Sequence, residues 1–251
     1  MKPYILILSY KNSKNIKKIN DDRFLYNYFI ADPSLDTDYK KSEEEDDNKI
    51  FIKCEENIPS KLFFLSIKYI KRYLYKKIYG VFKTDDDVEL DLNELYDYLE
   101  KNKEIDYFGK VYESTSHTSN YYFNKFGTNK DMVIPQCKYC NGIGYYISKK
   151  MIPFIIKNEE DSDKIIYEDL FVGVSLNKND IYPKIVNVER NFVKNIDSIK
   201  PPEDKPKEIV NTPPIKRNPI PINNQSNLCK YCGYPKNKIR YNFCQKCGRL
   251  Y

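Results

Sequence analysis

The sequence lacks the features that mark several large classes of protein. Tryptophan is absent, histidine occurs only at His117, and no hydrophobic run is long enough to cross a bilayer. The apolar residues 5–8 are followed at once by polar ones, which excludes a secretory signal or a transmembrane helix there. We therefore expect a cytoplasmic protein with no membrane span. Tyrosine and phenylalanine still bring the aromatic content to 15%, which supplies enough apolar surface for a core.

Cysteine is too sparse for a disulfide framework, and its spacing favours a metal site in a reducing compartment. Four of the seven cysteines form two C-x-x-C-G knuckles, with eleven residues between the second and the third cysteine. This spacing fits a tetrahedral Zn²⁺ site, and a unit as short as residues 227–251 has too small a core to fold without one. The pattern resembles a zinc ribbon, with redox or disulfide pairing as the alternative. The predicted zinc ligands are Cys229, Cys232, Cys244 and Cys247.

A second pair of cysteines, Cys137 and Cys140, has no partner knuckle. We expect Cys137 to be a free thiol. Cys140 is expected to pack beside the glycines that follow it, and a second metal site there is the less favoured alternative.

Charge separates the tail of the chain from its body. The formal net charge is +6, but eleven Lys or Arg oppose only three Asp or Glu from Ser198 onward, so the body is close to neutral. A near-neutral body argues against nucleic acid as the substrate of the main domain, whereas the basic tail leaves nucleic acid or a docking protein open as its partner. Residues 200–222 contain seven prolines without periodicity, which indicates an extended linker. We therefore divide the chain into a main domain (1–197), a linker (198–226) and the ribbon (227–251).

Strand and helix patterns alternate through the main domain, which predicts an α/β fold with a largely parallel sheet. Apolar runs bounded by polar residues indicate strands at residues 4–10, 25–30, 50–54, 80–84, 105–112 and 143–148. Helical spacing of apolar residues indicates helices at residues 60–79, 92–101, 149–157 and 168–177, the second with Asp91 as its N-cap. The acidic residues 36–47 and the polar residues 113–130, which include His117, are interpreted as loops. Lysine is abundant throughout, so single lysines receive little weight.

Three consecutive aspartates follow the strand predicted at residues 80–84. Side chains two apart on a strand point the same way, so Asp85 and Asp87 are placed to converge on one ligand. Carboxylate oxygens suit Mg²⁺ or Mn²⁺ and leave positions for diphosphate oxygens. The carboxyl ends of strands are also where ligands bind in open α/β sheets. A solvated loop or a helix cap is the alternative interpretation.

Two later segments carry further residues suited to a site. Gly142 and Gly144 stand immediately ahead of a predicted strand, where glycine permits a close approach of the backbone to a ligand or forms an ordinary turn. Glu168 and Asp169 begin a predicted helix, where acidic side chains also match the helix dipole without any further role.

Taken in order, these segments resemble motifs of the β-1,3-galactosyltransferase and fringe-type family, family 31 of the glycosyltransferases. Residues 82–88 (FKTDDDV) are similar to its K-x-D-D-D block, residues 139–148 (YCNGIGYYIS) to its Y-C-S-G-G-G-Y-x-x-S block, and residues 168–173 (EDLFVG) to its E-D-V-[FY]-V-G block. A weaker match at residues 57–61 (NIPSK) precedes a long helix and ends at Lys61. The resemblance spans residues 50–185.

The resemblance implies a GT-A fold, a Rossmann-like nucleotide-binding domain that uses Mn²⁺ or Mg²⁺ and a nucleotide-sugar donor, usually a UDP-sugar. It implies that Asp87 binds the metal together with Asp85, and that Asp85 and Asp86 also hold the donor. Many members carry a metal-binding histidine late in the domain, a position that His117 does not match. The remaining positions that the resemblance assigns to the donor are Lys61, Gly142 and Gly144.

The resemblance also implies an inverting displacement of the β-1,3 hexosyltransferase type. Asp169 is the implied general base that takes the proton from a hydroxyl of a glycan or protein acceptor, with Glu168 as the second candidate. Two alternatives remain open at this point: an inactive scaffold with the same fold, and a nucleic-acid- or protein-binding protein that acts through its zinc ribbon.

Overall fold

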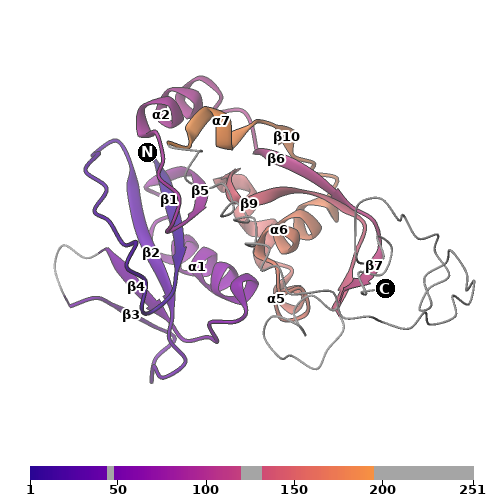
Figure 1. Ribbon diagram of the computed structural model, residues 1–251, viewed down its shortest axis with the longest axis horizontal. Coiled ribbons are helices and arrows are strands. Elements are labelled where there is room, and N and C mark those ends of the chain that lie inside the picture. The colour runs from indigo at the N-terminus through magenta and orange to yellow at the C-terminus, as the bar shows by residue number, and fades with distance from the viewer. Residues whose placement is uncertain (44–47, 120–131, 195–251) are drawn as a thin grey trace, which may run out of the picture.

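An eight-stranded sheet forms the centre of the protein (Figure 1). The computed structural model describes residues 1–43, 48–119 and 132–194. The strands lie side by side in the order β10-β6-β9-β5-β1-β2-β4-β3. Their bounds are β1 (Lys2–Ser9), β2 (Leu25–Ala31), β3 (Tyr39–Lys41), β4 (Lys49–Ile52), β5 (Ile78–Asp85), β6 (Tyr107–Ser114), β9 (Cys137–Ser148) and β10 (Lys184–Ile185).

The centre of this sheet is parallel, as the alternating sequence pattern predicts. β5, β1, β2 and β4 all run the same way, and β10 is parallel to β6. β9 runs antiparallel between β5 and β6, and β3 is antiparallel to β4. The mixed α/β class is therefore confirmed, with an antiparallel strand that the sequence pattern did not reveal.

Helices cover both faces of the sheet, because its central strands are apolar on both sides. Along β1, Tyr4, Leu6 and Leu8 point into one core, whereas Ile5 and Ile7 point into the other. The first core is covered by α1 (Pro59–Tyr73), α4 (Ile152–Ile156) and α6 (Glu168–Asn177), and the second by α2 (Leu92–Lys101) and α7 (Val188–Phe192). The 3-10 helix η1 (Lys149–Met151) leads into α4, and α5 (Glu159–Lys164) precedes α6.

Two helices match their predicted bounds because the sequence marks their ends clearly. α2 spans Leu92–Lys101, and the Asp91 carboxylate caps it by accepting hydrogen bonds from the backbone N–H groups of Asn93 and Glu94. α6 begins at Glu168 and ends at Asn177, and most of its residues are buried.

The helix expected at residues 60–79 is shorter than predicted. α1 begins at Pro59, which suits the first turn because it needs no backbone N–H donor there, and it ends at Tyr73. Residues 74–77 form a turn, and Ile78 then enters β5 fully buried. The apolar spacing continues past Tyr73 without a Gly or Pro, so the sequence carries no stop signal there. The helix expected at residues 149–157 is likewise divided between η1 and α4.

Two segments interpreted as loops contain strands. β3 lies within the acidic run and pairs with β4. In the polar stretch, β6 extends to Ser114, and β7 (His117–Ser119) pairs with β8 (Met132–Ile134) in a separate ribbon. His117 is therefore a strand residue and not a loop residue. These strands are short or exposed, so they lack the apolar alternation that marks a strand in sequence.

The predicted linker and the predicted zinc ribbon, with Cys229, Cys232, Cys244 and Cys247, lie outside the described residues. In the ranges that are described, none of the helices is both long and apolar enough to reach across a bilayer.

Candidate active site

The acidic triplet lies at the carboxyl end of β5, as predicted. Asp85 is the last residue of β5 and stands in register with Leu8 on β1, and Asp86 accepts a hydrogen bond from the Ser9 hydroxyl. Asp86 and Asp87 form the turn that follows. The strand alternation that was to align Asp85 with Asp87 therefore does not apply, because the strand ends between them.

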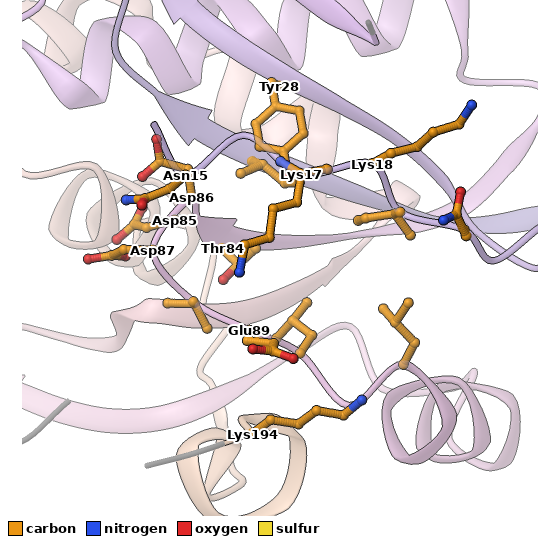
Figure 2. Close-up of a pocket in the computed structure, with 16 residues that line it drawn as sticks. Asn15, Lys17, Lys18, Tyr28, Thr84, Asp85, Asp86, Asp87, Glu89 and Lys194 are labelled. Atoms are coloured by element: carbon orange, nitrogen blue, oxygen red, sulfur yellow. Dashed lines mark hydrogen bonds between the residues drawn. The ribbon is translucent and has the colours of Figure 1, made fainter. Parts of the chain in front are cut away.

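A cleft of about 460 Å³ opens where β1 and β5 end. Figure 2 shows the three aspartates grouped at one side of this cleft. Lys17 extends into the cleft from the loop that follows β1, and Lys194 lies across the cleft from Lys17. The Tyr28 hydroxyl anchors that loop, since it donates to the Lys17 carbonyl oxygen and accepts from the Lys17 N–H. The cleft thus places lysine side chains beside a cluster of carboxylates.

Lys83 connects the three predicted motifs. Its side chain is only 1% exposed, and its ammonium lies 2.7 Å from Asp85 Oδ1, 2.7 Å from the Gly142 carbonyl oxygen and 2.8 Å from Glu168 Oε1. Burial alone would lower the pKa of Lys83, but the charges of Asp85 and Glu168 outweigh that effect and raise it. The lysine is therefore a permanent cation between two acidic groups that lie far apart in sequence.

The glycine motif is an irregular part of β9 and not a turn ahead of it. β9 starts at Cys137, and its register against β6 shifts so that residues 141–144 stand opposite Lys110 alone. Within this bulge the Gly142 N–H donates to Asp169 Oδ2 over 3.2 Å. A Cβ atom at Gly144 would lie 3.0 Å from Phe82 and 3.1 Å from Val188, so core packing explains that glycine.

At the start of α6, Glu168 is buried and Asp169 is half-buried against this bulge. Burial raises the pKa of Glu168 to about 7, although Lys83 opposes the shift. Burial likewise raises the pKa of Asp169, against the effects of Lys83 and of N–H donors from Leu170 and Gly142. Raised carboxyl pKa values suit proton transfer near neutral pH.

The triplet concentrates negative charge that a divalent cation would offset. Burial raises the pKa of Asp87, and repulsion from Asp85 and Asp86 adds to the shift, so bound positive charge would relieve this cluster. Within the described ranges, no group of three or more His, Cys, Asp or Glu side chains, the triplet included, is arranged to hold a metal ion. An open site of one or two carboxylates completed by water and phosphate oxygens is nevertheless typical of Mg²⁺.

Two other sets of predicted residues lie elsewhere. Lys61 on α1 pairs with Asp163 over 2.9 Å and does not line the cleft, so nothing in the geometry brings it to the donor. Cys137 and Cys140 are both free thiols, as expected for Cys137, and Cys140 is fully buried. Burial raises the pKa of the Cys140 thiol to about 12, which makes it unreactive.

Sequence reasoning missed Lys83 and the cleft residues Lys17 and Lys194. Lys83 had a signal: it stands between Phe82 and Thr84 in an otherwise apolar strand, where a lysine is buried only if it is paired. No sequence feature marked Lys17 or Lys194 as a site residue, because neither lies in a motif.

Comparison with known proteins agrees with this geometry. The family model described as Galactosyltransferase matches residues 56–187, whereas a search of curated proteins finds no match. The matched range holds the triplet, the β9 bulge and the Glu168–Asp169 pair, and it covers more than half of the 251 residues. The chain therefore belongs to the galactosyltransferase family of glycosyltransferases.

Proposed function

We propose that the protein is a metal-dependent, inverting glycosyltransferase that moves a sugar from a UDP-sugar to an acceptor hydroxyl, with β-1,3 hexosyl transfer as the reaction. One observation carries the proposal. Asp85 of the triplet and Glu168 of the α6 pair both contact the buried Lys83, and the triplet lines a cleft at the carboxyl ends of the strands.

In this proposal the aspartate triplet binds the nucleotide-sugar donor. Asp85 and Asp87 would hold a Mn²⁺ or Mg²⁺ ion, with Asp86 beside them. When bound, that ion supplies positive charge for the departing diphosphate. Lys17 and Lys194 line the same cleft and favour a phosphorylated ligand over a neutral one.

Asp169 is the proposed general base for the acceptor hydroxyl. The acceptor oxygen attacks the anomeric carbon while the bond from that carbon to the diphosphate oxygen breaks, and Asp169 takes the acceptor proton. Attack and departure occur on opposite faces of the sugar, so the anomeric configuration inverts. The Gly142 N–H and the Leu170 N–H each bind one oxygen of Asp169, which fixes the carboxylate for this role.

Release of UDP tests the proposal. The full-length protein is incubated with a panel of UDP-sugars and Mn²⁺, without and with simple glycan acceptors, and free UDP is measured. We expect release with one class of donor, and a loss of about a hundredfold or more in Asp87→Ala because the charge on the leaving group is no longer offset.

Asp97→Ala is the matched control, because Asp97 is an exposed aspartate on α2 outside the cleft. It should keep the wild-type rate. Absence of UDP release with every donor, or equal release by Asp87→Ala, would refute the proposed reaction. Thermal-shift measurements with the same donor panel identify the nucleotide-sugar independently of turnover.

A further inference from the structure

Lys83 has more contacts than charge neutralisation requires. An ammonium group has three N–H donors, and three oxygen atoms from three separate segments lie within 2.8 Å of it. Two of these atoms belong to carboxylates, but the third is the backbone carbonyl oxygen of Gly142, which carries no net charge to neutralise. Holding that peptide in place is therefore a separate role.

The Gly142 residue links this lysine to Asp169. Its carbonyl oxygen accepts from Lys83 Nζ, and its own N–H donates to Asp169 Oδ2 over 3.2 Å. The residue lies in the part of β9 that is out of register with β6, so the sheet alone does not fix it. A Cβ at this position would also lie 3.5 Å from the Glu168 carboxylate oxygens, which shows how closely the bulge packs on the acidic pair.

We propose that Lys83 is a positioning residue that orients the Asp169 carboxylate through the Gly142 backbone. This inference rests on the proposed function for its consequence, since an oriented Asp169 matters for catalysis only if Asp169 is the base. The physical link itself, from ammonium to peptide to carboxylate, is testable without turnover.

The test compares full-length variants that separate charge from position. Lys83→Met removes the ammonium but strands Glu168 as a buried, unpaired carboxylate, which is itself strongly destabilising. The double variant Lys83→Met/Glu168→Gln removes both charges and should restore the fold. The matched control is Lys68→Met/Glu159→Gln, which deletes a Lys–Glu pair of 3.3 Å between α1 and α5, away from the β9 bulge.

The first readout is hydrogen exchange of the Gly142 amide in protein labelled with ¹⁵N-glycine. The chain has eight glycines, so the spectrum is simple, and Gly142→Ala assigns the signal. We expect exchange to accelerate by about tenfold or more in Asp169→Asn and in Lys83→Met/Glu168→Gln, but not in the control pair. Wild-type exchange at Gly142 in the double variant would overturn the proposal.

The second readout is kinetic. Relative to Glu168→Gln alone, a misplaced base lowers kcat by about a hundredfold while the KM for the donor stays within threefold, because all three aspartates remain and Asp85, whose side chain is 44% exposed, stays hydrated without Lys83. Combining Lys83→Met/Glu168→Gln with Asp169→Asn should cost no more than Asp169→Asn alone, since both act through one group. If the double variant kept the full kcat, Lys83 would serve only to neutralise the charge of its neighbours and would not position Asp169. A wild-type enzyme without turnover would refute the proposed function, and the exchange measurement would still decide the role of Lys83.

Discussion

Two sets of carboxylates lie near Lys83, the more exposed triplet and the more buried pair on α6, and they differ in exposure more than in chemistry. The side chain of Asp85 is 44% exposed, whereas that of Glu168 is 10% exposed. Burial raises the pKa of both carboxyl groups of the α6 pair, and that of Glu168 reaches about 7, so this set holds a proton more readily than solvated carboxylates do. The exposed set is open to a cation and to phosphate oxygens. The comparison teaches that environment, and not residue type, assigns the two sets their roles.

The largest expected effect comes from the buried set. Asp169→Asn keeps the shape of the side chain but removes the proton acceptor, so kcat should fall by about 10² to 10⁴-fold. Binding of UDP should change by less than threefold, because the triplet is untouched. Turnover assays measure the fall in kcat, and UDP titration measures the change in affinity for UDP. If kcat stays within tenfold of wild type, Asp169 is not the base, and Glu168→Gln becomes the variant to measure.

Glu168 predicts a dependence of stability on pH. Its pKa is about 7 in the folded protein against an ordinary 4.5, so the folded state binds the proton more tightly than the unfolded state does. The stabilisation is complete below pH 4.5 and is lost as the pH rises to about 7. Relative to Glu168→Gln, the free energy of unfolding of the wild type should fall by roughly 3 kcal/mol across this window.

Denaturant unfolding at several pH values measures this difference. Glu189→Gln is the control, since it also removes the acid of a Lys–Glu pair but on the more exposed α7. A difference between wild type and Glu168→Gln that stays constant or grows with pH would show that Glu168 is not a strained buried acid.

A third environment sharpens the comparison. Asp91 is not buried like Glu168, and it does not line the cleft as Asp85 does, because its carboxylate caps α2. Asp91→Ala should lower the free energy of unfolding by about 1 kcal/mol and leave the KM for the donor unchanged. Thermal unfolding and donor kinetics check this. A loss of donor binding without a loss of stability would show that the cleft extends to this carboxylate.

The smallest effect is expected in the exposed set. Asp87→Asn removes a carboxylate that burial and its neighbours disfavour, so the protein without divalent ions should be stabilised by about 0.5 kcal/mol or less, given solvent screening. Thermal unfolding in the presence of a metal chelator measures this change in stability. Destabilisation by more than about 1 kcal/mol would mean that Asp87 supports the fold and is not reserved for a ligand.

The sequence predicted correctly those helices and strands whose ends are marked by charged or capping residues. α2 has an aspartate cap, and α6 begins with two acidic residues and continues as an apolar run, so both bounds were predicted correctly. The position of the triplet at the end of β5 was predicted for the same reason, because three charges interrupt an apolar strand.

The remaining features depend on contacts between distant segments. β9 begins at Cys137 because it pairs with β6 there, although residues 137–141 show no strand alternation. Lys83 is buried because Asp85 and Glu168 both reach it, and only the folded chain brings Glu168 there. No local pattern records such tertiary pairing.

Titration of UDP into the full-length protein, with and without Mn²⁺, tests most directly whether the triplet is a metal-dependent donor site. The account predicts that UDP binds only when Mn²⁺ is present, that Asp87→Asn abolishes the binding, and that Asp169→Asn retains it. Equal binding without Mn²⁺, or undiminished binding by Asp87→Asn, would contradict it.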